Sequence, residues 1–168
     1  MENGQPQSVP VLRCRPQRDM YNETMNARIV VVEDELELAK ILRDYLEAAG
    51  FDVRIATDGA SGLALAEQSP ADLVILDLNL PGMDGLDVAR QLRRHSETPI
   101  IMVTALTEFG DIERAVDCGT DDFLSKPVNR WELIARVRTM LKLKHLSDKL
   151  DRTLAYLEQL EKETQPKG

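Results

Sequence analysis

Oxygen-bearing and positively charged side chains stand at the ends of several short apolar runs in this sequence. Each run is a candidate strand, and the carboxyl ends of parallel strands meet at one edge of a sheet, where open α/β folds bind ligands. Taken singly, a carboxylate in such a position is usually a helix cap or a solvated group. Their convergence would change that interpretation, and the residues concerned are Glu33, Asp34, Glu35, Asp77, Thr104 and Lys126.

Carboxylates gathered at one sheet edge repel each other and need a cation. The ligands are all oxygens, so Mg²⁺ is expected rather than zinc, and Mn²⁺ could substitute for it. A Mg²⁺ ion held by one or two carboxylates keeps an open position for a phosphate oxygen. A lysine and a hydroxyl opposite the metal could bind the remaining phosphoryl oxygens. The set therefore predicts a phosphoryl-transfer site with a carboxylate nucleophile.

The elements that must position these side chains alternate along the chain. Apolar runs predict strands at 29–33, 52–56, 72–77, 99–104 and 121–125, and amphipathic stretches predict helices at 35–49, 59–68, 85–95, 108–118 and 129–144. The first, third and fourth runs are continuous and rich in β-branched residues, which is typical of strands covered on both faces. We expect an α/β domain of the (βα)5 type, with a five-stranded parallel sheet in the flavodoxin-like order 2-1-3-4-5.

Local signals place the helix boundaries. Asp58, Asp84 and Asn129 can serve as N-caps, and Gly50 can end the first helix. The first helix should bury one face, made of Leu38, Ile41, Leu42, Tyr45 and Leu46.

Residues 1–26 are polar, contain three prolines and have no sustained periodicity, so we expect a disordered leader. Its arginines, Arg13, Arg15 and Arg18, could contact an anion, but a solvated tail is the favoured interpretation. The folded domain is expected at 27–145, followed by a helical or coiled-coil extension of the last helix at 146–168.

The last helix is expected to pack one face on the sheet, made of Trp131, Leu133, Ile134, Val137 and Leu141. Beyond it, leucines follow a 3-4 spacing with Thr153 at the one polar site: Leu143, Leu146, Leu150, Leu157 and Leu160. This spacing predicts a short coiled coil and a homodimer, with parallel helices. Only about two and a half heptads are present, and a single amphipathic helix that folds back on its own domain is the alternative.

Composition excludes some classes of function. The net charge of −8 argues against nucleic-acid binding, so we expect no direct DNA binding, and no helix-turn-helix or winged helix is expected after residue 145. Two cysteines, Cys14 and Cys118, cannot build a disulfide framework and indicate a reducing compartment. There is no apolar run of about 20 residues and no signal-peptide pattern, so a cytoplasmic protein without membrane contact is expected.

Four segments, IVVVEDE, LVILDLNLPGMDG, IIMVTA and DDFLSKP, resemble the signature blocks of the receiver domains of two-component response regulators. The resemblance covers about residues 28–145 with every block in order. It implies that a sensor histidine kinase or phosphotransfer protein donates a phosphoryl group to Asp77. It also implies a signalling switch with no enzymatic turnover beyond its own phosphorylation and dephosphorylation.

The resemblance assigns roles to individual residues. Asp34 would bind Mg²⁺ together with Asp77, Glu33 would assist, and Asn79 would offer its backbone carbonyl. Lys126 and Thr104 would each bind a phosphoryl oxygen, and Phe123 would be the switch aromatic. The Lys126–Pro127 bond would be cis. The chain departs from the common pattern with Glu-Asp for Asp-Asp and with Phe for Tyr at the switch, where an ordinary core aromatic is the alternative.

Other functions stay open at this point. A Mg²⁺-dependent phosphatase of the haloacid-dehalogenase type also uses an aspartyl nucleophile, but its second aspartate is replaced here by Asn79 and no cap domain is evident. A degenerate receiver used only for docking is a third possibility. The chain could be a single-domain regulator, or a fragment of a longer one whose output is enzymatic, such as cyclic-dinucleotide turnover.

Overall fold

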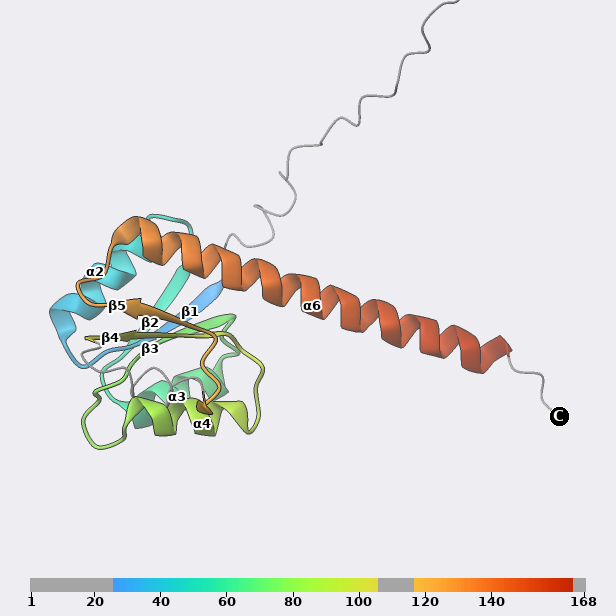
Figure 1. Cartoon of the computed structure of the whole chain (residues 1–168), viewed down its shortest axis with the longest axis horizontal. Helices are drawn as coiled ribbons and strands as arrows, with labels where there is room; N and C mark the ends of the chain where they lie inside the picture. The colour runs from blue at the N-terminus through green and yellow to red at the C-terminus, as the bar shows by residue number, and fades with distance from the viewer. Residues whose placement is uncertain (1–25, 106–116, 165–168) are drawn as a thin grey trace, which may run out of the picture.

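The computed structural model describes residues 26–105 and 117–164. Strands and helices alternate along the chain (Figure 1). They are β1 (Arg28–Val32), α2 (Leu36–Glu47), β2 (Asp52–Ala56), α3 (Gly59–Gln68), β3 (Leu73–Asp77), α4 (Gly85–Arg93), β4 (Ile100–Thr104), β5 (Asp122–Ser125) and α6 (Arg130–Thr164). The expected leader, except for Asn26, and most of the expected helix at 108–118 lie outside the described residues.

The five strands form one parallel sheet in the order β2-β1-β3-β4-β5, so the predicted flavodoxin-like order is confirmed. In β1, Val30 and Val32 belong to the apolar cluster on one face of the sheet, and Ile29 and Val31 belong to the cluster on the other. Both faces are therefore covered. This explains why the central strands have continuous apolar sequences instead of alternating ones.

Helices α2 and α6 cover one face of the sheet, and α3 and α4 cover the other (Figure 1). The three predicted N-caps are confirmed by their hydrogen bonds. The Asp58 carboxylate accepts from the backbone N–H of Ser61 at 2.8 Å, and the Asp84 carboxylate accepts from that of Leu86 at 3.0 Å. The Asn129 side-chain oxygen accepts two backbone N–H groups, at 2.9 and 3.2 Å, in the first turn of α6. Each cap satisfies donors that have no partner inside the helix.

Two residues that were expected in the core lie at the surface. Trp131 is 75% exposed and Ile41 is 45% exposed. On α6, Trp131 stands about 200° around the helix from the buried Leu133, so the two side chains cannot face the same sheet. The Arg130 guanidinium instead lies 5.4 Å from the centroid of the Trp131 ring and 5.6 Å from that of Tyr45. This is a surface cation–π arrangement.

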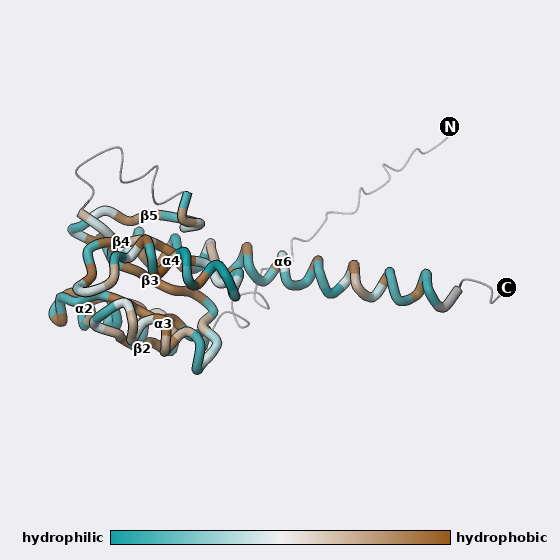
Figure 2. Tube along the Cα trace, turned by 90° about the horizontal axis from the view of Figure 1, so that it is seen from below, coloured by the Kyte–Doolittle hydropathy of each residue, from teal (hydrophilic) through white to brown (hydrophobic). Residues whose placement is uncertain are grey.

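Helix α6 is continuous over 35 residues, about 52 Å at the rise of an α-helix. It was predicted to cover 129–144 with an extension, and it continues as a single rod to Thr164. Figure 1 shows that the second half projects away from the domain and does not fold back on it. Figure 2 shows the apolar residues concentrated in the strands and recurring at intervals along the projecting half. Within the described residues, no helix has the length and apolarity of a membrane span.

Gly85 brings the start of α4 against the end of β3. A Cβ atom at this position would overlap the backbone carbonyl oxygen of Asp77 and would lie 2.9 Å from the Cα of Leu78. The backbone N–H of Gly85 donates to the carbonyl of Leu78 at 2.9 Å. The fold therefore needs a residue without a side chain at this point of contact.

We predict that Gly85→Ala lowers the free energy of unfolding by about 2–3 kcal/mol, because backbone atoms must move apart to admit the methyl group. Gly82→Ala is the control: Gly82 has a positive φ of 78° but nothing within 4 Å of its missing Cβ, so only backbone strain of about 1 kcal/mol is expected. Urea denaturation measures both. Equal losses for the two variants would contradict the close contact.

Candidate functional site

The strand register brings polar residues to adjacent positions at one edge of the sheet. Glu33 and Asp77 each lie one residue beyond a matched pair of β1 and β3. Thr104 lies one residue beyond the β4 partner of Asp77, and Lys126 lies one residue beyond the β5 partner of Thr104. This edge is the carboxyl end of the sheet, where the sequence predicted a site.

The Lys126 ammonium lies between two buried carboxylates. Its Nζ is 3.0 Å from Oδ2 of Asp77, and it donates to Oε1 of Glu33 at 3.2 Å. Its distance to Oε2 of Glu33 is 3.0 Å. Glu33 is 1% exposed and Asp77 is 4% exposed, so both ion pairs lie in a region of low dielectric. Such pairs are strongly coupled, because water screens them poorly.

The same carboxylates fit a divalent cation. One oxygen atom from each of Glu33, Asp34 and Asp77 lies within 4.8 Å of the others, and Asp34 is exposed at the mouth of the group. Oε2 of Glu33 is buried and has no hydrogen bond from any donor of the described residues, although Lys126 lies near it as an ion-pair partner. Three carboxylates and one ammonium leave two negative charges. An oxygen-only ligand set with this charge suits Mg²⁺.

Burial and charge shift the pKa values of the buried groups. Burial raises the pKa of the Glu33 carboxyl, and the nearby Asp77 charge adds to the effect, while the hydrogen bond from Lys126 opposes it. Burial alone would lower the pKa of Lys126, but its hydrogen bonds to Glu33 and Asp77 together raise it. The lysine is therefore held as an ammonium.

Backbone groups complete the edge. The N–H of Asn79 donates to Oδ1 of Asp77 at 3.4 Å, and the N–H of Glu35 donates to Oε1 of Glu33 at 3.3 Å. The backbone N–H of Lys126 donates to the carbonyl of Thr104 at 3.0 Å and holds the end of β5 against β4. Both oxygens of Asp77 thus have a donor.

The remaining predicted residues lie at or near this edge. Thr104 is buried at the end of β4, and the peptide bond between Lys126 and Pro127 is cis. Phe123 is half-buried on β5 and packs against the apolar cluster beneath α3 and α4. Hydrogen bonds join Lys126 to Glu33 and Asp77, and the strand register places Thr104 beside them.

The sequence did not predict two features of this edge. One is the contact of Gly85 with the backbone of Asp77, for which the only signal was a glycine after the N-cap Asp84. The other is an open groove of about 530 Å³ beside Lys126, between the first turns of α2 and the segment before α6. Its lining is Glu35, Glu37, Leu38, Ile41, Tyr45, Lys126, Pro127 and Val128. The exposed Ile41 lines this groove, whereas the sequence predicted that Ile41 is buried in the core.

Comparisons with known proteins agree with this geometry. Residues 29–138 match the family model of the response regulator receiver domain. MtrA of Mycobacterium tuberculosis (strain ATCC 25618 / H37Rv), a DNA-binding response regulator, is 44% identical over 120 residues, which cover 71% of this chain and 53% of MtrA. The transcriptional regulatory protein BaeR of Escherichia coli O6:H1 is 44% identical over 115 residues, which cover 68% of this chain and 48% of BaeR. The chain spans about half the length of these relatives.

Solved structures of receiver domains have the same fold as this chain. The receiver domain of the Francisella response regulator 1452 superposes with a TM-score of 0.67 and 30% identity, covering 71% of this chain and 99% of that domain. A CheY-like receiver domain protein from Methanospirillum hungatei JF-1 superposes with a TM-score of 0.70 and 26% identity. The match covers 73% of this chain and 98% of that protein.

The relatives correct one expectation. We expected no direct DNA binding, on the basis of the net charge and of the sequence after residue 145. This expectation is contradicted, because MtrA is named as a DNA-binding response regulator and BaeR as a transcriptional regulatory protein. An acidic receiver domain is compatible with DNA binding by the protein that contains it, since the surface charge of one domain does not report on another.

The family model matches well over half of the chain, and MtrA is 44% identical across 71% of it. The chain belongs to the response regulator receiver domain family.

Proposed function

We propose that Asp77 accepts a phosphoryl group from a phosphohistidine and that this modification switches the association of the chain with its partners. The observation that carries the proposal is the buried Asp77 carboxylate, 3.0 Å from the Lys126 ammonium and within 4.8 Å of two further carboxylates. In the transfer, a bond forms between an Asp77 oxygen and phosphorus, and the bond from phosphorus to the donor imidazole breaks. The imidazole leaves with the electron pair and takes up a proton from water.

Mg²⁺ fits the acidic group and would neutralise the charge of the transferring phosphoryl group when bound. Asp34 and Asp77 would be its carboxylate ligands, and Glu33, with its unbonded Oε2, would assist. The backbone carbonyl of Asn79 is a further ligand candidate at the end of β3. Mn²⁺, which also takes oxygen ligands, could replace Mg²⁺.

Lys126 and Thr104 would bind the phosphoryl oxygens. The ammonium already lies against Oδ2 of Asp77, so it can follow the new negative charge with little displacement. Thr104 is buried at the neighbouring strand end, and its hydroxyl is the second donor in the proposal. Thr104 ends β4 and Lys126 directly follows β5, both on one side of β3, so phosphorylation would draw β4 and β5 toward Asp77.

We predict that Asp77→Asn abolishes labelling by acetyl phosphate in the presence of Mg²⁺, because an amide cannot act as the nucleophile. Intact-mass spectrometry measures the added phosphoryl group. The control is Asp87→Asn, an exposed aspartate of α4 paired with Arg90 at 2.8 Å, which should label like the parent. Labelling of Asp77→Asn at the parent level would show that another residue is the acceptor.

The metal site has its own test, which does not need phosphorylation. Asp34→Asn should weaken Mg²⁺ binding at least about tenfold, because it removes an exposed carboxylate from the oxygen ligand set. Isothermal titration calorimetry of the unphosphorylated protein measures the affinity. Glu37→Gln is the matched control, since Glu37 is acidic and exposed nearby but is not part of the carboxylate group. Equal affinity for Asp34→Asn and the parent would remove Asp34 from the site.

The donor would be a sensor histidine kinase or a phosphotransfer protein, which this chain would meet in the cytoplasm. The open groove beside Lys126 has an apolar wall from α2 that includes Ile41. The exposed Leu36 and Trp131 flank the same end of the domain. The apolar wall of the groove lies beside Lys126, which contacts Asp77, and favours the docking of a protein donor over that of a small molecule alone.

The output would pass through β5 and α6. Phosphorylation adds about −1.5 to −2 charges to a group that already holds carboxylates. Asp122 of β5 binds Arg136 of α6 at 2.6 Å, and Arg136 also binds Glu132 at 2.9 Å. A shift of β5 therefore acts directly on the surface of α6. We place the end of the receiver domain near residue 145, just after the last buried residue of α6, Leu141. The relatives indicate DNA binding as one output that such a switch controls.

We predict that beryllofluoride, a phosphoryl mimic, changes the oligomeric state or its concentration dependence in the presence of Mg²⁺. Multi-angle light scattering measures the molar mass with and without the mimic. Asp77→Asn is the control and should not respond, because it lacks the carboxylate that binds the mimic. An unchanged mass for the parent at every concentration would count against the switch.

A further inference from the structure

The projecting half of α6 carries a stripe of exposed leucines. They are Leu143, Leu146, Leu150, Leu154, Leu157 and Leu160, and their exposures range from 38% to 59%. Six large apolar side chains along one helix form a continuous patch, which soluble proteins usually cover. The stripe includes Leu154, which lies outside the strict 3-4 spacing predicted from the sequence.

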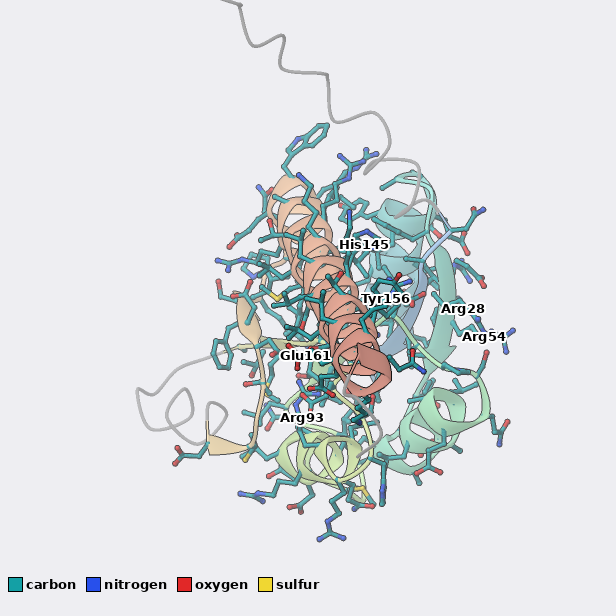
Figure 3. All side chains as sticks on the ribbon, turned by 90° about the vertical axis from the view of Figure 1, so that its right-hand side faces the viewer. Arg28, Arg54, Arg93, His145, Tyr156 and Glu161 are labelled. Carbon is teal, nitrogen blue, oxygen red and sulfur yellow. The ribbon has the colours of Figure 1, made fainter. Side chains whose placement is uncertain are left out.

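The described part of the domain, residues 26–105 and 117–164, does not cover this stripe. At 3.6 residues per turn, Leu150 points about 140° away from Val137, which is fully buried against the sheet. Figure 3, viewed toward the end of α6, shows His145 and Tyr156 on the same side of the helix. At 100° per residue, the middle of the leucine stripe lies about 100° farther around the helix from these two residues. Because α6 is one continuous helix, it cannot turn this stripe toward the sheet.

We propose that the stripe binds the same stripe of a second copy of this chain, and that the two α6 helices run antiparallel. A 3-4 spacing of leucines is self-complementary, since each side chain fits between those of an identical helix. The proposal rests on the association of two chains proposed above, but not on the phosphorylation of Asp77. It replaces the parallel arrangement expected from the sequence.

The charges along α6 decide the direction. Residues 142–149 contain three lysines against one aspartate, whereas residues 150–163 contain four acidic side chains against one arginine and one lysine. In an antiparallel pair, the basic half of each helix faces the acidic half of the other. In a parallel pair in register, each half would face its own charge, which is unfavourable.

The apolar layers support the same direction. An antiparallel alignment places Leu143 opposite Leu160 of the partner subunit and Leu146 opposite Leu157 of the partner subunit. In the same register Leu150 lies opposite Thr153 of the partner subunit, and Leu154 lies within about one residue of the level of Leu150 of the partner subunit. In a parallel alignment, Thr153 would face Thr153 of the partner subunit and Leu154 would stay at the edge of the contact. The antiparallel pair covers all six leucines.

Cysteine cross-linking distinguishes the two directions. Leu143→Cys and Leu160→Cys are made separately in a Cys14→Ser background, where the other native thiol, Cys118, is buried. A short bis-maleimide reagent is added to each variant and to their mixture, with a size tag on one of them. The antiparallel pair predicts cross-linking only in the mixture, because equal positions lie about 25 Å apart along the helix axis.

Each outcome of the cross-linking experiment supports or overturns one part of the proposal. Cross-linking of each variant with itself but not in tagged–untagged mixed pairs would overturn the antiparallel direction. No cross-linking beyond that of the background protein in any sample would overturn the dimer. The same experiment in an Asp77→Asn chain should give the parent pattern. If labelling at Asp77 fails while the cross-link persists, the phosphoacceptor proposal falls and the dimer proposal stands.

A second pair of variants tests the stripe itself. Leu150→Asp should weaken dimerisation at least about tenfold, because it places a charge in the middle of the apolar contact. Ala155→Asp introduces the same residue on the opposite side of the same helix and should keep the parent affinity. Sedimentation equilibrium measures the affinity, and circular dichroism checks that both variants keep the parent helicity. Equal dimerisation of the two variants would overturn the proposed contact.

Discussion

A single ammonium group holds two buried carboxylates at the edge of the sheet, and the geometry of the site depends on this interaction. Glu33 and Asp77 come from neighbouring strands, and without a cation their charges would repel each other where water is excluded. Lys126 reaches both from beyond β5, at 3.0 Å from an oxygen of each. A buried charge that loses its partner costs several kcal/mol, so such a cluster weakens the fold unless it is fully paired. The presence of this charged cluster at the buried edge of the sheet indicates a chemical role.

The rest of the fold supplies the rigidity that this cluster needs. Central strands with apolar residues on both faces fix the register, and the register fixes which side chains meet at the edge. The contact of Gly85 with the backbone of Asp77 adds a second constraint from the opposite side. Asp77 is therefore held by its own strand, by the helix that follows, and by a lysine 49 residues farther along the chain.

The sequence predicted the sheet order, because buried parallel strands have a continuous apolar pattern. It also predicted that polar residues at the strand ends meet at one edge, where the structure brings Glu33, Asp77 and Lys126 together. It did not predict that Lys126 binds Glu33 as well as Asp77, since periodicity carries no side-chain distances. It wrongly placed Trp131 and Ile41 in the core. Both lie beside the buried face of a helix, and the sequence does not show how wide that buried face is. The sequence did not show where α6 ends within its C-terminal half, because neither Gly nor Pro interrupts the sequence between 130 and 164. The net charge did not predict the DNA binding for which relatives such as MtrA are named, since it averages over this chain alone.

The short strand β5 joins the site to the helix that projects from the domain. It has four residues, with Lys126 directly after its last residue and Asp122, the ion-pair partner of Arg136, as its first. A strand this short moves nearly as a unit, so a displacement of Lys126 toward new charge on Asp77 also displaces Asp122. Arg136 lies in the first turns of a continuous helix of 35 residues, and a rotation there is carried along the whole rod. If Asp77 is phosphorylated as proposed, the stripe of exposed leucines would turn with α6, and the way in which two such stripes meet would change.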